Sequence, residues 1–150
     1  MTHYRKSIEI GAPPDKVFKV LDDPEHFPEW VDHCVEVKFL TPKKHGLDSA
    51  IELTLRFAGF DFKSRTKVIG YEKGYRFTIE GTQGIVGSRN TDTVEALPNG
   101  GSQVIWDVKY ELPSIAGKIA DELLLGRMFE QSVEKSLKNL KQKMEHGAAT

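Results

Sequence analysis

Hydrophobic and polar residues alternate with a period of two through the first residues and the middle of the chain, as in strands with one buried face. Seven such stretches lie near residues 3–10, 34–41, 49–57, 60–71, 75–81, 85–97 and 102–112. Short clusters rich in glycine, lysine or asparagine separate the last six stretches. Links this short join antiparallel neighbours, so the pattern predicts an antiparallel meander.

The period changes near the end of the chain, where apolar residues recur mostly at steps of three and four. Between Ser114 and Gly147 they are Ile115, Ile119, Leu123, Phe129, Val133, Leu137, Leu140 and Met144. This spacing predicts one amphipathic helix with a single apolar stripe. A helix of about 30 residues is ~45 Å long, and a compact chain of this length has a radius of gyration of ~15 Å. We therefore expect the helix to cross the whole fold and to cover the apolar face of the sheet.

Two shorter helices are predicted between the first and second strands. The Pro13-Pro14 pair ends the first strand, and Pro14 or Asp15 can open a helix. Pro24 restarts the chain into a second short helix with the sequence PEHFPEWV. We expect its Phe27 and Trp30 to pack against the sheet edge.

Large aromatic residues gather on the face that the alternation assigns to the interior. They are Phe57, Phe62, Tyr75, Phe77, Trp106 and Tyr110. A helix with its side chains is only about 10–12 Å across, so a bent sheet of seven strands encloses more width than the helix fills. The remaining space is either plugged by these rings or left as a cavity that they line.

Three segments are similar to a known family: IEIGAPPDKVFKVLDDPEHFPEWV, LPNGGSQVIWDVKYEL and GKIADELLLGRMFEQSVEKSLKNLKQKMEH. With the order of elements, they resemble the helix-grip superfamily (SRPBCC) of START-like and birch-pollen-allergen-like proteins, in its polyketide cyclase/dehydrase and lipid-transport branch. The resemblance covers nearly the whole chain. It implies an α+β fold in which a seven-stranded antiparallel sheet curves around the C-terminal helix, as one domain over residues 1–150 with a disordered tail from about 147. It also implies a cavity for an apolar ligand, but none of the three segments is a catalytic motif.

The strand near residues 85–97 interrupts the apolar interior. If Val94 faces inward, Ser88, Asn90 and Asp92 face inward with it. One interpretation is that these groups bind the polar end of a mostly apolar ligand. The other is that a β-bulge near Gly87 reverses the register, or that the strand end is open to water. In a cavity, burial would raise the pKa of Asp92, which makes it the best candidate for an acid-base group.

Composition and charge narrow the classes of function. The 150 residues carry a net charge of −1, which gives no general attraction to nucleic acid. The basic residues Arg56, Lys63, Arg65, Lys67 and Arg76 fall on the outer face beside acidic partners, so we interpret that face as solvated. Cys34 is the single cysteine, and no apolar run resembles a signal peptide or a membrane span. We therefore expect a cytoplasmic protein that does not bind nucleic acid.

His26, Asp32, His33 and Cys34 lie close together in the sequence, but their spacing matches no compact zinc pattern. We interpret both histidines as solvent-exposed or capping residues and predict no metal and no cofactor. The chain also lacks the GxSxG, GxxxxGK and HExxH motifs.

Two further features concern access to the interior. The hairpin tip from Phe57 to Phe60 is apolar where turns are normally polar. It can cap the cavity or make a transient contact with a membrane or a protein, unless both phenylalanines are buried in the core. Gly126 lies in the middle of the long helix, where it gives room to a strand, a kink or a ligand.

Three functions remain after these observations. The first is non-catalytic binding or transport of a small hydrophobic molecule, such as a lipid, a quinone or a polyketide. The second is a cyclase or dehydratase in which Asp92, Asn90 or Tyr110 moves a proton, and the third is a protein-interaction module with a filled core. For the first two we expect a ligand site on the inner faces of the strands and the long helix, made of Phe57, Phe62, Tyr75, Phe77, Ser88, Asn90, Asp92, Trp106, Tyr110, Leu124, Met128 and Phe129. The oligomeric state is not predicted.

Overall fold

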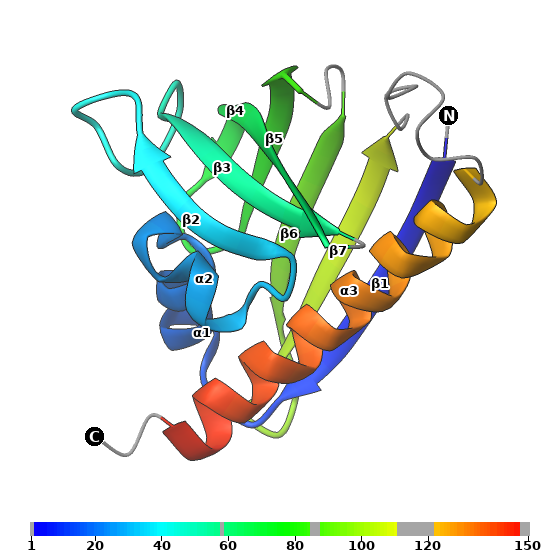
Figure 1. Cartoon of the computed structure of the whole chain (residues 1–150). Helices are drawn as coiled ribbons and strands as arrows, with labels where there is room; N and C mark the ends of the chain where they lie inside the picture. The colour runs from blue at the N-terminus through cyan, green and yellow to red at the C-terminus, as the bar shows by residue number, and fades with distance from the viewer. Residues whose placement is uncertain (1, 58, 85–87, 111–121, 148–150) are drawn as a thin grey trace.

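The computed structural model describes residues 2–57, 59–84, 88–110 and 122–147. Seven antiparallel strands form one sheet in the order β1-β7-β6-β5-β4-β3-β2 (Figure 1). The strands are β1 (Thr2–Ile10), β2 (Cys34–Phe39), β3 (Ala50–Phe57), β4 (Phe60–Glu72), β5 (Arg76–Gln83), β6 (Arg89–Ala96) and β7 (Ser102–Tyr110). The predicted meander from β2 to β7 is confirmed, and β1 adds to it by pairing with β7.

Two short helical segments connect β1 to β2, as predicted. Helix α1 (Pro14–Leu21) starts with a proline, whose missing N–H group costs nothing in the first turn, and it buries Val17, Phe18 and Leu21. A 3₁₀ turn, η1 (Pro24–His26), leads into α2 (Phe27–Trp30). Together these segments lie against one end of the curved sheet (Figure 1).

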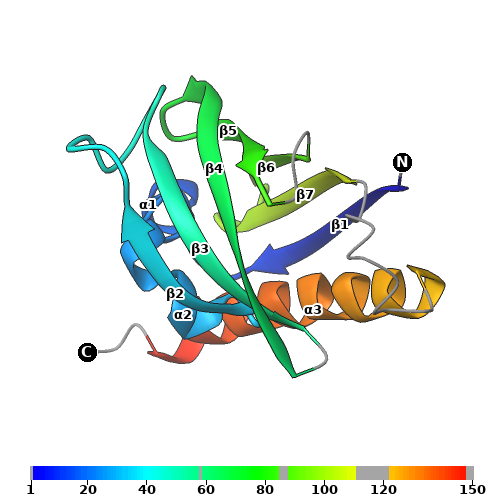
Figure 2. The ribbon, with the colours of Figure 1, turned by 45° about the horizontal axis from the view of Figure 1, so that its top comes forward.

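The long helix α3 (Glu122–Gln142) continues into a π-helical turn, η2 (Lys143–Gly147). It runs along β1 and contacts α2 and β3, so that the sheet curls over it (Figure 2). Its apolar stripe is confirmed over the described turns, because Val133, Leu137 and Leu140 are buried in the core. The part of the prediction that covers residues 114–121 lies outside the described residues.

The outer face of the sheet carries basic side chains that form ion pairs with acidic ones, as predicted. Arg56 forms two hydrogen bonds with Asp61, of 2.6 and 2.9 Å. Arg65 and Lys63 both reach Glu52 on the neighbouring strand. Such exposed pairs contribute little to stability, but they agree with a solvated face and leave the core on the other side.

Among the described residues, no helix is both long enough and apolar enough to cross a membrane.

Candidate functional site

A cavity of about 120 Å³ lies between the sheet and α3. Helices α2 and α3 and the strands surround it, and of the strands only β1 gives no lining residue among the described ones. Its lining residues are Phe27, Trp30, Val31, His33, Cys34, Leu53, Leu55, Ser64, Thr66, Phe77, Ile79, Ser88, Arg89, Asn90, Asp92, Trp106, Val108, Lys109, Tyr110, Phe129 and Val133. A cavity needs at least ~10–15 Å³ of such volume to hold one water molecule, so this one has room for a small organic group. The core is therefore not completely filled.

The cavity brings together seven of the twelve residues predicted for the ligand site. They are Phe77, Ser88, Asn90, Asp92, Trp106, Tyr110 and Phe129. Phe57 lies just behind this lining, with its ring centroid 5.3 Å from that of Phe129, and Phe62 packs against Phe57. Met128 is half-buried and is not among the described lining residues, and the side chain of Leu124 lies outside the description.

The structure places Tyr75 differently from the prediction. Its side chain is 39% exposed, and its ring faces the guanidinium group of Arg76 at 5.1 Å. The reason is that β5 begins at Arg76, so Tyr75 belongs to the preceding turn and the inward alternation does not extend to it. Tyr75 therefore does not line the cavity.

The polar row on β6 faces inward. Residues 89–96 of β6 pair in continuous register with β7, without a bulge over that range, and a bulge near Gly87 would lie outside the described residues. Asp92 is 4% exposed, and Asn90 donates a hydrogen bond to its carboxyl group at 2.5 Å. The cavity wall thus contains a buried carboxyl group, as the first interpretation of this strand requires.

Burial raises the pKa of Asp92 well above its ordinary value, and the nearby carboxyl group of Asp22 raises it further. The indole N–H of Trp106, its cross-strand partner, acts weakly in the opposite direction without forming a hydrogen bond of normal geometry. Asp22 is itself partly buried, which raises its pKa, and it accepts a hydrogen bond of 2.6 Å from the Tyr71 hydroxyl. In a buried site a carboxyl group such as that of Asp92 is held in its protonated form and can donate a hydrogen bond.

His33 was not predicted to be part of the site, and the interpretation of it as an exposed or capping residue is wrong. It lines the cavity and packs against the rings of Phe57 and Phe129, whose centroids each lie 5.2 Å from the centroid of the His33 ring. Its Nδ1 atom lies 2.9 Å from Oγ of Ser132 on α3. Burial lowers the pKa of His33 to about 4, so the ring is neutral at physiological pH. Its sequence neighbours give no sign of this, because the surroundings come from residues far along the chain.

Both tryptophans of the chain, Trp30 and Trp106, line the cavity, with their ring centroids 5.7 Å apart. Trp30 on α2 was expected to pack against the sheet edge. Its indole N–H is buried and forms no hydrogen bond within the described part of the chain. A buried donor without a partner costs about 1–3 kcal/mol, and an acceptor on a bound molecule would remove this cost. The neighbouring Cys34 is a buried thiol whose pKa is raised by burial to about 11, so it is inert as a nucleophile.

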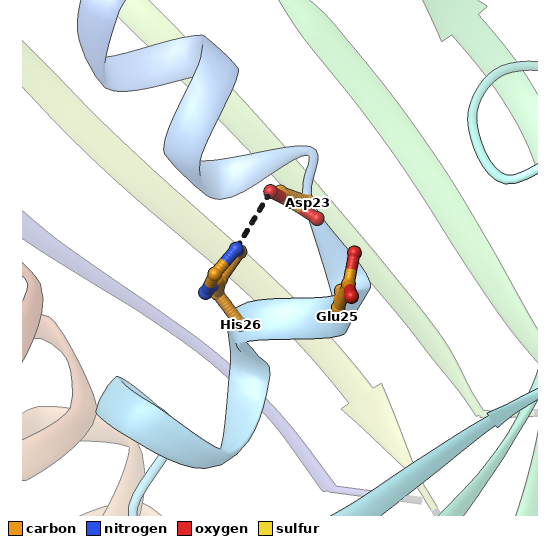
Figure 3. Close-up of side chains that lie close together, drawn as sticks. All are labelled: Asp23, Glu25 and His26. Carbon is orange, nitrogen blue, oxygen red and sulfur yellow. Dashed lines mark ion pairs between the residues drawn. The ribbon is translucent and has the colours of Figure 1, made fainter.

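A second cluster lies on the surface at η1, and none of its three residues lines the cavity. Asp23, Glu25 and His26 hold their ligand atoms within 4.8 Å of one another (Figure 3). His26 is hydrogen-bonded to Glu29 and lies 3.5 Å from Asp23, and its pKa is raised by these carboxylates. Ion pairing on an exposed turn accounts for this arrangement.

The two phenylalanines at the tip between β3 and β4 differ in their exposure to solvent. Phe57 is buried in the core, whereas Phe60 is 67% exposed. The interpretation of an apolar exposed tip therefore fits Phe60 alone, and the interpretation of burial in the core fits Phe57 alone.

A curved seven-stranded antiparallel sheet around a long C-terminal helix, with a mainly apolar cavity between them, defines the helix-grip class of ligand-binding folds. The sequence pattern of the family described as "Polyketide cyclase / dehydrase and lipid transport" matches residues 1–145. The chain belongs to this family, which confirms the resemblance seen in the sequence.

Individual relatives agree with this assignment at the level of the fold. An uncharacterised protein of Mycobacterium tuberculosis is 23% identical over 145 residues, which cover 92% of this chain and 81% of that protein. A solved structure from Thermus thermophilus matches 99% of this chain and 100% of its own with a TM-score of 0.84 and 15% identity. A START superfamily protein from Mycobacterium smegmatis matches with a TM-score of 0.76 and 17% identity, over 97% of this chain and 99% of that one.

Proposed function

We propose that this protein binds a small, mainly apolar molecule in the cavity between the sheet and α3, without catalysing a reaction. The observation that carries the proposal is the lining: apolar side chains surround a few polar groups, of which Asp92 and the N–H of Trp30 are buried. Apolar burial supplies the affinity of such a site, at about 25 cal/mol per Å² before the costs of association, and a few polar groups orient the ligand. A module with a filled core would not need these features.

The size of the cavity limits the ligand. An apolar cavity of roughly 150 Å³ accepts a benzene molecule, so about 120 Å³ accommodates one ring or a short alkyl segment in the present conformation. A longer lipid, quinone or polyketide would extend out of the cavity or require the sheet and helix to separate.

Tryptophan fluorescence tests this proposal directly, because both tryptophans line the cavity. The protein would be titrated with octanoate, a benzoquinone head group and 4-ethylphenol, one probe for each ligand class. We expect at least one probe to change the emission saturably. No saturable change with any of the three would contradict the proposal.

A pair of variants locates the binding. Ile79 lines the cavity, and Ile79→Phe adds bulk there, so it should weaken binding. Ile69 on β4 is 37% exposed and does not line the cavity, so Ile69→Phe is the matched control and should bind as the parent does. Equal binding by both variants would place the probe elsewhere on the protein.

A cyclase or dehydratase is the second candidate, and the raised pKa of Asp92 is the observation that favours it. A buried carboxylic acid can serve as a general acid towards a bound substrate. Asp92→Asn separates the two functions. An enzyme of this kind would lose turnover while it retained binding, whereas a binding protein would show no turnover to lose.

The cytoplasmic location remains a prediction from the sequence.

A further inference from the structure

A chain of hydrogen bonds fixes the proton on the ring of His33. Asp32 is a carboxylate paired with Lys135, with 3.3 Å between Oδ1 and Nζ, so it can only accept. Ser132 donates its single hydroxyl proton to Asp32 at 2.8 Å. The Ser132 oxygen must therefore accept from His33, which makes Nδ1 of His33 the donor across 2.9 Å.

The second ring nitrogen is then a bare acceptor. A neutral imidazole carries one proton, and here that proton is on Nδ1. No hydrogen bond reaches Nε2 from any described residue. The rings of Phe57 and Phe129 both pack against the imidazole and hold it in place. Because Nδ1 faces the helix, Nε2 is the nitrogen left for the cavity that His33 lines.

We propose that Nε2 of His33 recognises the ligand by accepting a hydrogen bond from a hydroxyl group on an uncharged, mainly apolar molecule: a phenol, an enol or an alcohol. This inference rests on the proposed function and narrows its ligand class. A carbonyl or quinone oxygen has no proton to donate to Nε2. A carboxylate has no proton to donate to Nε2, and it would place a negative charge against the nitrogen lone pair inside a mainly apolar cavity.

Three compounds of similar shape test the inference by calorimetry: 4-ethylphenol, 4-ethyltoluene and 4-ethylbenzoate. One neutral hydrogen bond contributes about 0.5–1.5 kcal/mol, so the phenol should bind roughly 2- to 13-fold more tightly than the hydrocarbon. The benzoate should bind least. In His33→Phe the phenol and the hydrocarbon should bind with equal affinity, because the added bulk of the ring affects both compounds alike.

The control is His26→Phe, which makes the same substitution on the exposed η1 turn and should keep the preference for the phenol. Retained preference in His33→Phe would overturn the inference while leaving the proposed function intact. Binding of none of the three compounds to the parent protein would overturn both.

A second measurement does not depend on ligand or on the folding of a His33 variant. Long-range ¹H–¹⁵N NMR of the parent protein distinguishes the two imidazole tautomers, and we expect the Nδ1–H form for His33. In Ser132→Ala the hydrogen bond that fixes the Nδ1–H form is lost, so the Nε2–H form should also be populated and the preference for the phenol should fall. Ser102→Ala is the control, because the buried Ser102 hydroxyl on β7 donates to the Ala12 carbonyl and takes no part in this chain of hydrogen bonds. An Nε2–H tautomer in the parent protein would overturn the inference.

Discussion

Tyr71 on β4 donates a hydrogen bond of 2.6 Å to Asp22 at the end of α1, and so ties the first helix to the sheet across 49 residues of sequence. The bond also lowers the pKa of Asp22, opposing the effect of burial.

Tyr71→Phe removes this bond and should cost about 1–2 kcal/mol at neutral pH, because a largely buried acceptor loses its donor. Urea unfolding measures the loss. Tyr75→Phe is the control, since that hydroxyl belongs to an exposed ring, and it should change stability little. If Tyr71→Phe lowers the free energy of unfolding as little as Tyr75→Phe does, the hydrogen bond between Tyr71 and Asp22 does not contribute to stability.

Asp92 should make the protein less stable as the pH rises. Its pKa is raised in the folded state, so its contribution is fully present below the unfolded pKa of ~3.9 and is lost as pH rises through the folded pKa. The slope from this group is at most about 1.4 kcal/mol per pH unit. Asp92→Asn keeps an acceptor for Asn90 and should flatten the curve. Asp15→Asn, on an exposed turn of α1, should leave it unchanged.

His33 should affect the stability of the folded protein in the acidic pH range. Its pKa of about 4 lies below the ordinary value of 6.5, so the unfolded chain binds a proton more readily between these two values. Stability from this group is therefore present above pH 6.5 and is lost as pH falls towards 4. In His33→Phe, urea unfolding between pH 4 and 6.5 should show a shallower decline. A decline as steep as in the parent would contradict the assigned pKa shift.

The arrangement of strands and the inner face could be read from the sequence, whereas much of the site could not. Alternation predicts the face of Phe77, Asp92 and Trp106, because a period of two depends only on local geometry. It fails at Tyr75, where the strand has not yet begun. It also misses His33, whose partner Ser132 lies 99 residues away.

The two phenylalanines at the β3–β4 tip should differ in how much stability is lost when each is replaced by alanine. Phe57→Ala removes a buried ring that packs against His33, Phe62 and Phe129, and should cost about 3–5 kcal/mol. Phe60→Ala changes an exposed ring and should stay within about 0.5 kcal/mol. Thermal unfolding compares the two. If Phe60 contacts a membrane, its variant should also lose sedimentation with lipid vesicles while its stability is unchanged.

Two glycines should respond oppositely to alanine. At Gly126 in α3 an added Cβ would meet, among the described residues, the Tyr110 hydroxyl at an ordinary 3.6 Å, so Gly126→Ala should stabilise the protein by about 0.5–1 kcal/mol. At Gly84 the backbone has a φ of +84° and an added Cβ would lie 2.6 Å from the Lys63 carbonyl oxygen. Gly84→Ala should therefore destabilise. A destabilised Gly126→Ala would indicate that the space beside Tyr110 is needed.

The pairing of β1 with β7 has a consequence for how the protein is made. Thr2 pairs with Tyr110, so β1 stays unpaired along this edge until β7 has been made. Contacts so distant in sequence close slowly, and unpaired strand edges are prone to aggregate in the meantime. Helix α3 follows later still and contacts β1. The interior therefore takes shape only after α3 has been made, and a ligand can enter it only from that point.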